Sequence, residues 1–289
     1  MNEVLEVRNL CKKYPTFSLS DVSFSMKVGE IMGFVGRNGA GKTTTIKSLF
    51  NLVHPDSGTI LFKGKPFLAD ELKNKQDVSV LLGGVDYYKR TKIGTLTSVT
   101  KRFYTRWDEE KYKDLLSRFQ LDENKRVGEL SAGMKVKYGL AVSLSHHASL
   151  LVLDEPTSGL DPVSRDEVLN LFEDLVDREK VSILFSTHIM SDLDKCADSV
   201  TYIQKGRILA SKPLAAFEKD YLLLKGDKTD IFDKVKGKAI SFHERRNQVE
   251  ALYRKEDFPK DSGYEAKIPD LDTIMVYLEK EYEHEEPLE

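Results

Sequence analysis

The glycine-rich segment Gly36–Thr44, GRNGAGKTT, restricts the fold of this chain more than any other stretch. It follows the apolar run Ile31–Val35, opens the helical pattern KTTTIKSLF, and satisfies G-x-x-x-x-G-K-[ST]. Glycines let a backbone wrap around a phosphate with its N–H groups directed inward. The spacing is not the G-x-G-x-x-G of dinucleotide folds. A strand, this phosphate loop (Gly36–Thr44) and a helix together predict an α/β protein that binds a nucleotide.

Two side chains of the phosphate loop have specific expected roles. Lys42 is expected to neutralise charge on the β- and γ-phosphates, and the Thr43 hydroxyl is expected to bind Mg²⁺. A glycine-rich turn without function is the alternative, and the flanking strand and helix disfavour it. The predicted nucleotide-binding residues of the loop are Gly36, Asn38, Gly39, Ala40, Gly41, Lys42, Thr43 and Thr44.

The segment LLVLDEPTSGLD places two carboxyl groups at the end of an apolar run. Leu150–Leu153 is typical of a buried strand, so Asp154 falls at its carboxyl end, where open parallel sheets bind their ligands. We expect Asp154 to hold Mg²⁺ through a water molecule, and Glu155 to activate or position the attacking water. An ordinary acidic pair at a strand end is the alternative, which the phosphate loop disfavours.

Two further residues are candidates by their position in the chain. His188 ends the apolar segment VSILFST, where an imidazole could hydrogen-bond a γ-phosphate and sense its loss, although a lone histidine is usually structural. Tyr14 precedes the phosphate loop and could stack on adenine. From spacing alone, a core or edge tyrosine is an equal alternative for Tyr14.

Composition and charge narrow the class of protein. The chain has 289 residues, enough for about two domains, with 40% hydrophobic and 31% charged residues, as in soluble globular proteins. The net charge is −3 and the basic residues are dispersed, so no nucleic-acid partner is expected. There is no apolar run of about 18 residues and no signal-peptide core, which predicts a cytoplasmic protein that meets a membrane only through a partner.

Hydrophobic patterning divides the chain. Residues 1–213 are expected to form one α/β domain with continuous apolar parallel strands and an antiparallel edge layer of alternating strands. About residues 86–147 read as a helical insert, in which Asp108 caps an amphipathic helix. Residues 214–289 are expected to form a small α+β domain with a helix near Ile231–Val235 and another over Leu271–Tyr282. The expected strands are Leu5–Val7, Val22–Met26, Ile31–Val35, Thr59–Phe62, Val78–Leu82, Leu150–Asp154 and Ser182–Ser186.

The LSAGM segment (Leu130–Met134) opens another helical pattern with a serine and a glycine. Helix N-termini of this kind bind anions, yet the phosphate loop already provides one anion site. The order of the phosphate loop, LSAGM, LVLDEP, SGLD and STH resembles that of ATP-binding cassette (ABC) nucleotide-binding domains, over about residues 3–212. The resemblance implies a P-loop NTPase that holds ATP and Mg²⁺ between two cassettes in a head-to-tail dimer.

The resemblance also implies roles that spacing leaves open. Ser131 and the backbone of Gly133 would bind the γ-phosphate of ATP held by the partner cassette. Asp161, in SGLD, would help to position the opposite site, and Tyr14 would stack on adenine. Because ATP then touches two chains, it would favour the closed dimer, and hydrolysis would let the dimer reopen.

Two departures from the family pattern matter. Ala132 and Met134 stand where the family usually has glycine and glutamine, but the two residues with phosphate roles remain. A glutamine that the family places near Gly83 is also missing, and neither Gly83 nor Gly84 can bind Mg²⁺ through a side chain. Asp86 or a water molecule is expected to substitute.

The helical insert FYTRWDEEKYKDLLSRFQLD and the tail segment IPDLDTIMVYLEK resemble ATPase subunits of bacterial ABC-2-type exporters. The resemblance extends to ATPases of Gram-positive antibiotic, bacteriocin and peptide exporters. It implies a peripheral subunit at the inner face of the cell membrane, with separate integral membrane permease subunits and a second, identical or paralogous ATPase chain. The alternative is a soluble ABC ATPase without a transport role, acting on ribosomes or nucleic acid.

Overall fold

The computed structural model describes residues 3–82, 88–227, 238–245, 248–259 and 266–285. The chain divides into two compact units, Met1–Ser211 and Lys212–Glu289, and each is described by itself. The sequence placed the boundary before Leu214. No helix in the described ranges is long and apolar enough to cross a membrane.

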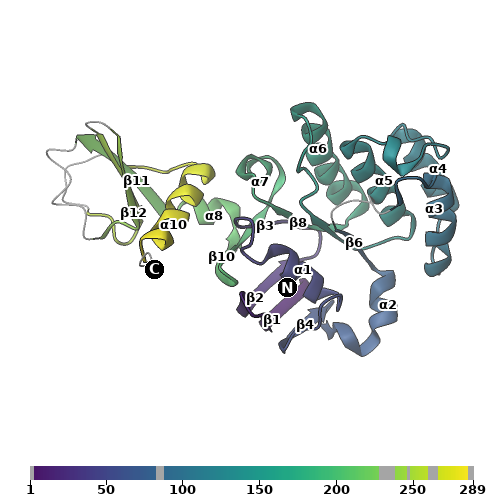
Figure 1. Cartoon of the computed structure of the whole chain (residues 1–289), viewed down its shortest axis with the longest axis horizontal. Helices are drawn as coiled ribbons and strands as arrows, with labels where there is room; N and C mark the ends of the chain where they lie inside the picture. Colours follow the sequence, from purple (N-terminus) through teal and green to yellow (C-terminus); the bar gives the residue numbers. More distant parts are fainter. Residues whose placement is uncertain (1–2, 83–87, 228–237, 246–247, 260–265, 286–289) are drawn as a thin grey trace. The chain divides into compact units, whose positions relative to one another are not determined.

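A six-stranded sheet with the strand order β10-β9-β3-β8-β7-β6 forms the centre of the first unit (Figure 1). The pairs β9–β3, β3–β8, β8–β7 and β7–β6 are parallel, so their carboxyl ends meet at one edge. In register, Val35 pairs with Thr187 and Asp154 with Ser186. The strands are β3 (Ile31–Val35), β6 (Val78–Leu82), β7 (Leu150–Asp154), β8 (Ser182–Thr187), β9 (Ser199–Gln204) and β10 (Arg207–Pro213).

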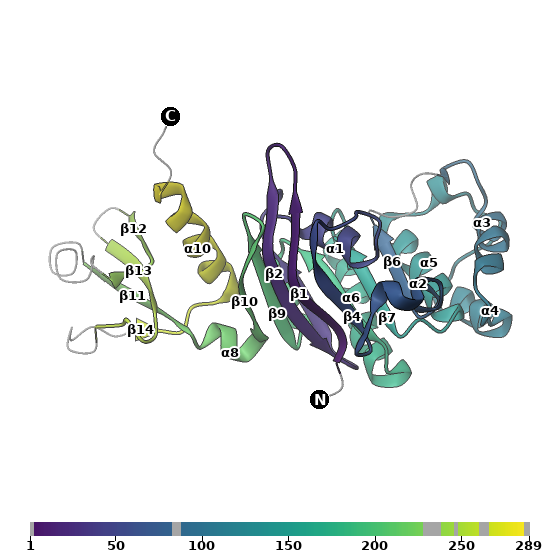
Figure 2. The same ribbon diagram turned by 90° about the horizontal axis from the view of Figure 1, so that it is seen from below.

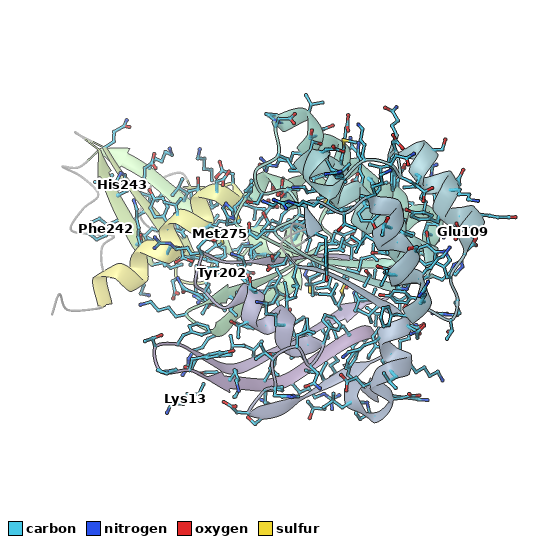
Figure 3. All side chains as sticks on the ribbon, turned by 45° about the vertical axis from the view of Figure 1, so that its right-hand side comes forward. Lys13, Glu109, Tyr202, Phe242, His243 and Met275 are labelled. Atoms are coloured by element: carbon cyan, nitrogen blue, oxygen red, sulfur yellow. The ribbon has the colours of Figure 1, made fainter. Side chains whose placement is uncertain are left out.

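Both faces of the central sheet are covered, which explains the continuous apolar runs. Along β7, Leu150 and Val152 pack on one side while Leu151 and Leu153 pack on the other. The first side faces α1 (Lys42–Leu49), and the second faces α6 (Pro162–Glu179). Buried Tyr202 on β9 is labelled among the side chains in Figure 3. The expected parallel strands are confirmed.

The antiparallel edge layer is also confirmed. Its strand order is β2-β1-β4-β5. The strands are β1 (Glu3–Lys13), β2 (Ser18–Lys27), β4 (Ser57–Phe62) and β5 (Lys65–Pro66). Burial alternates along β2, because one face packs on the core and the other faces solvent. Helix α1 lies between this layer and the central sheet (Figure 2). The short η1 (Phe67–Asp70) and α2 (Glu71–Gln76) lead from this layer into β6.

A group of helices lies beyond β6, the last strand of the central sheet (Figures 1 and 2). As expected, Asp108 caps the amphipathic helix, accepting a bond from the backbone N–H of Lys111 at 2.9 Å. The buried Thr97 hydroxyl lies 2.8 Å from the hydroxyls of both Tyr112 and Tyr138, which joins three helices. These elements are α3 (Ile93–Thr100), η3 (Lys101–Phe103), α4 (Glu109–Arg118, with Glu109 labelled in Figure 3), η4 (Val127–Glu129) and α5 (Ala132–Ser145).

Helix α5 ends at a buried histidine. The His146 ring stacks on Tyr104 at 3.7 Å, and its Nδ1 lies 3.1 Å from the carbonyl oxygen of Gln76. Burial disfavours the charged imidazolium and lowers the pKa of His146 to about 4. His146 is therefore a neutral packing residue at physiological pH.

The second unit is a four-stranded sheet with the order β12-β13-β11-β14 and a C-terminal helix. Leu224, Ala251 and Tyr253 form a small core, and the Tyr277 hydroxyl donates to Glu250 at 3.1 Å. Figure 3 labels Phe242 and His243 on β12 and Met275 on the helix. The helix expected near Ile231–Val235 lies outside the described residues. The elements are α8 (Leu214–Glu218), β11 (Tyr221–Asp227), β12 (Ser241–Arg245), β13 (Gln248–Arg254), β14 (Ala266–Lys267) and α10 (Leu271–Glu285). In the first unit, α7 (Met190–Cys196) precedes β9 and β10 along the chain, and the division between the two units falls within β10.

Candidate functional site

The phosphate loop makes the turn from β3 into α1, and two of its glycines have no alternative. A Cβ on Gly36 would lie 2.2 Å from the carbonyl oxygen of Ile203. Gly41 has φ +113°, and a Cβ there would lie 2.7 Å from the Leu19 side chain. Only glycine permits this close approach and this backbone conformation together. The loop therefore presents its backbone to the carboxyl edge of the sheet.

Lys42 places a positive charge inside the turn. Its side chain is buried, and Nζ donates to the carbonyl oxygen of Gly36 at 2.7 Å. The same ammonium lies 3.1 Å from Oε1 of Glu155. A cation that is held by backbone carbonyls and a single carboxylate is well placed to accept phosphate oxygens as further partners.

Two oxygen groups meet beside Lys42, as a magnesium site requires. The Thr43 hydroxyl donates to Oδ2 of Asp154 at 2.8 Å, and the Ser186 hydroxyl donates to Oδ1 at 2.6 Å. Within the described ranges, no group of three or more His, Cys, Asp or Glu side chains could hold a metal ion. A hydroxyl and a carboxylate nevertheless fit Mg²⁺, which takes few protein ligands and completes its shell with phosphate and water oxygens.

Glu155 and His188 also come together at this edge. Nδ1 of His188 lies 2.6 Å from Oε2 of Glu155. Glu155 has the left-handed φ of +53°, and its backbone N–H donates to the hydroxyl oxygen of Ser186 at 2.9 Å. Neighbouring strands β7 and β8 thus bring two residues 33 positions apart into contact. Ser186 had no expected role of its own from the sequence, and its signal was its place as the first residue of the STH motif.

A cavity of about 640 Å³ lies over the phosphate loop. Tyr14 is not part of its lining; the Tyr14 ring is 38% exposed and the ammonium of Lys12 lies 5.9 Å from its centre. Phe17 lines the cavity instead, and the N–H of Tyr14 donates to the Phe17 carbonyl oxygen at 2.8 Å in the turn that holds both residues. The lining residues are Thr16, Phe17, Arg37, Asn38, Gly39, Gly41, Lys42, Thr43, Thr44, Glu155, Ser158 and His188.

The LSAGM segment lies outside the lining of this cavity. Ser131 is the N-cap of α5 and accepts a bond from the N–H of Met134 at 3.2 Å, while Gly133 is buried. Asp161 caps α6, accepting from the hydroxyl of Ser164 at 2.6 Å and from two backbone N–H groups. The bond from Ser164 is the main reason that the pKa of Asp161 lies below its ordinary value.

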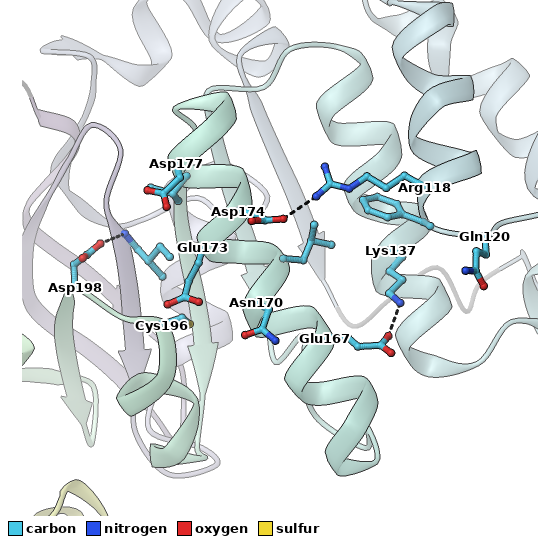
Figure 4. Close-up of a pocket in the computed structure, with 14 residues that line it drawn as sticks. Arg118, Gln120, Lys137, Glu167, Asn170, Glu173, Asp174, Asp177, Cys196 and Asp198 are labelled. Carbon is cyan, nitrogen blue, oxygen red and sulfur yellow. Dashed lines mark hydrogen bonds and ion pairs between the residues drawn. The ribbon is translucent and has the colours of Figure 1, made fainter.

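A larger hollow of about 840 Å³ has a different character (Figure 4). It lies beside α6, and two ion pairs, Arg118–Asp174 at 2.9 Å and Lys137–Glu167 at 2.6 Å, join α6 to α4 and α5. Its other acidic side chains are Glu173, Asp177 and Asp198. Carboxylates in excess of cations repel phosphate, so this hollow is no second nucleotide site. Gly83, Gly84 and Asp86 lie outside the described residues.

Comparison with known proteins agrees with this geometry. Residues 19–158 match the ABC transporter family. The chain is similar to the ABC transporter ATP-binding protein YtrB of Bacillus subtilis, with 31% identity over 220 residues. The alignment covers 76% of this chain and 75% of YtrB. It is 32% identical over 226 residues to the bacitracin transport ATP-binding protein BcrA of Bacillus licheniformis, which is 76% of this chain and 72% of BcrA.

The chain belongs to the ABC transporter family. It is an ABC ATPase, with the fold that the order of its motifs led us to expect. A solved ATP-binding subunit of an ABC transporter superposes with a TM-score of 0.66 at 27% identity, covering 75% of this chain and 92% of that one. The family match begins in β2 and ends at Ser158, so it includes the phosphate loop, LSAGM, Asp154 and Glu155 of the ABC ATPase but not His188.

Proposed function

We propose that this ABC ATPase is the motor subunit of an exporter, and that it binds ATP between two head-to-tail cassettes. The separation of two anion sites carries the proposal. Lys42, Glu155 and His188 line one cavity, whereas Ser131, the N-cap of α5, lies outside it. A second cassette would bring its own Ser131 and Gly133 to this cavity, and this chain would do the same for its partner.

Within the site, Lys42 and the loop N–H groups bind the β- and γ-phosphates. Thr43 and Asp154 would hold Mg²⁺, which would neutralise phosphate charge. Phosphate oxygens compete with Glu155 for Lys42 and His188, whose distances to the Glu155 carboxylate are 3.1 and 2.6 Å. The released carboxylate can then accept a hydrogen bond from the attacking water, while His188 contacts the γ-phosphate.

ATP that contacts two chains binds the closed dimer more tightly than the open one, so it shifts the equilibrium towards closure. Hydrolysis removes the γ-phosphate contact to the partner's Ser131 position and lets the dimer reopen. The alternation moves whatever is attached to the cassettes. We assign this mechanical role to residues 1–213, and an accessory role to the α+β domain of residues 214–289.

Separate integral membrane permease subunits would receive this motion, and the ATPase would lie against them at the inner face of the cell membrane. A relative named for bacitracin transport supports export of antimicrobial compounds or peptides. The sequence also resembles the ATPase of the staphylococcal phenol-soluble modulin exporter, which favours amphipathic peptides as cargo. The cargo would be bound by the permease and not by this chain.

Purification from membranes with a tagged chain tests the exporter role. We expect a polytopic membrane protein to co-purify in detergent, and the ATPase rate of that complex to rise when amphipathic peptides are added. The Lys42→Ala variant is the control, because it should retain the membrane partner and lose the ATPase activity. Recovery with ribosomes or DNA and without a membrane protein would contradict transport.

A further inference from the structure

Asp192 is a buried carboxylate that does not line the cavity over the phosphate loop. It lies in the first turn of α7, and its side chain is 0% exposed. Burial of a carboxylate is costly unless hydrogen bonds and an opposite charge satisfy both oxygens. Three side chains do so here. Oδ2 accepts from the hydroxyls of Thr157 at 2.6 Å and Thr187 at 3.1 Å, and Oδ1 accepts from the guanidinium of Arg165.

Each of these three partners neighbours a residue with a proposed role in hydrolysis. Thr157 follows Glu155 in the loop after β7, and Thr187 directly precedes His188 at the end of β8. The backbone N–H of Arg165 donates to the carbonyl oxygen of Asp161 at 2.9 Å in the first turn of α6. One carboxylate thus joins the segments that carry Glu155, His188 and Asp161.

The connecting loops are short and internally bonded, so a displacement at Asp192 would reach the reacting groups. The N–H of Ser158 donates to the carbonyl oxygen of Glu155 at 3.2 Å. The N–H of Leu160 donates to the carbonyl oxygen of Thr157, also at 3.2 Å. On the other segment, the Thr187 hydroxyl also accepts from the N–H of Ile189 at 3.0 Å, on the far side of His188. Through Thr157 and Thr187, Asp192 therefore anchors the loop that follows β7 and the loop that follows β8.

We propose that Asp192 is a positioning residue for ATP hydrolysis. It holds Glu155 and His188 in register and ties both to the Asp161 loop, so that contact with a second cassette at Asp161 alters the position of Glu155. The proposal rests on the proposed two-cassette function. Asp192 touches no substrate, and its effect passes through Thr157, Thr187 and Arg165.

Thr157→Val gives the cleanest test, since it removes the 2.6 Å bond and keeps the side-chain shape. We expect kcat for ATP hydrolysis to fall ~10-fold, because small misplacements of reacting groups cost large factors in rate. KM for ATP should change by less than about threefold, as the phosphate contacts remain. Thr157→Ser keeps the hydroxyl and should restore kcat. Asp192→Asn should reduce kcat ~10- to 100-fold, because its amide nitrogen cannot accept from these donors.

Asp166→Asn is the matched control. It breaks an ion pair between Lys195 and Asp166, which joins the same two helices at the surface, and it should leave kcat unchanged. A second measurement follows ATP-dependent dimerisation in the Glu155→Gln background, where Thr157→Val should lower the dimer fraction at a given ATP concentration. Thermal unfolding identifies any variant that fails to fold. If Asp192→Asn fails to fold, the kcat of Thr157→Val alone tests the positioning role.

Unchanged kcat in Thr157→Val, or a loss that Thr157→Ser does not restore, would overturn the positioning role. A fall in kcat for Thr157→Val that is no larger than the fall for Asp166→Asn would also overturn it, since both would then reflect only weaker packing of α6 on α7. Failure of the proposed function looks different. In that case, the parent Glu155→Gln protein forms no ATP-dependent dimer, although the unmodified chain hydrolyses ATP.

Discussion

The phosphate loop and the LSAGM segment each open a helix with residues suited to bind a phosphate, yet their surroundings in this chain differ. Around the phosphate loop, Glu155 is paired with Lys42 at 3.1 Å and with His188 at 2.6 Å. Beside them, Asp154 accepts hydrogen bonds from the hydroxyls of Thr43 and Ser186 at 2.8 and 2.6 Å. At LSAGM, the Ser131 hydroxyl oxygen accepts a hydrogen bond from the N–H of Met134, at the start of its own helix. The difference supports our proposal of a complete site and a half-site, which is the arrangement that two cassettes related head to tail would need.

The largest expected effect comes from Glu155→Gln, which removes the proposed base from the complete site. We expect kcat to fall ~100- to 10,000-fold, the range for loss of a general base, with ATP binding retained. The variant should accumulate as an ATP-bound dimer in size-exclusion chromatography. Glu173→Gln, in the hollow beside α6, is a control for loss of a carboxylate. Monomer only, or near-normal turnover, would contradict the role of Glu155.

Lys42→Ala should weaken nucleotide binding ~10- to 100-fold, because charge-assisted bonds to phosphate contribute about 1.5–3 kcal/mol. The dissociation constant of a fluorescent ATP analogue measures the change. Lys47→Ala, on the same helix α1, should bind normally. Equal weakening by both substitutions would mean that only the total charge of the helix matters.

Ser131→Ala separates the half-site from the complete site. ATP binding by the isolated chain should stay within about twofold of the unmodified protein, since Ser131 does not line the cavity. Turnover should fall ~10-fold, because the hydroxyl contact belongs to the closed dimer. Loss of the N-cap costs about 1 kcal/mol of stability, which thermal unfolding quantifies. Weaker ATP binding by dilute, monomeric protein would break the distinction between the two regions.

The smallest effect concerns the adenine end of the complete site, where Tyr14 and Phe17 are rival candidates. Stacking of a base on an aromatic ring contributes about 1–3 kcal/mol. We expect Phe17→Ala to weaken ATP binding by ~5-fold or more, and Tyr14→Ala to have less effect, since only Phe17 lines the cavity. The dissociation constants of the two variants decide between them, and a dominant effect of Tyr14→Ala would favour the family pattern over the geometry of this turn.

Much of the fold could be predicted from the sequence. Continuous apolar runs such as Leu150–Leu153 indicate strands that are covered on both sides, because no other environment buries every side chain. The alternation along Val22–Met26 indicates a half-exposed layer for the same reason. The Gly36–Thr44 motif and Asp154 then indicate the carboxyl edge of the sheet as the site.

Other features could not be predicted, because they depend on how segments distant in the chain pack. The sequence indicated Tyr14 as an aromatic near the loop, whereas in the folded chain Phe17 lines the cavity. Ser186 belongs to STH but had no expected role, and Asp192 lies in none of the motifs. Their contacts depend on the packing of β7, β8 and α7 against one another.

The sequence by itself determined which groups take part: a glycine turn that can surround phosphate, a lysine, two carboxylates and a histidine, and a second helix start of similar chemistry. Only the tertiary structure decided which of these groups meet. The parallel register of β3, β7 and β8 brings Glu155 within hydrogen-bonding distance of Lys42 and of His188, whereas Ser131 stays outside their cavity. The physical reason is that hydrogen bonds and charge pairs act over a few ångströms, and the folded backbone sets distances on that scale.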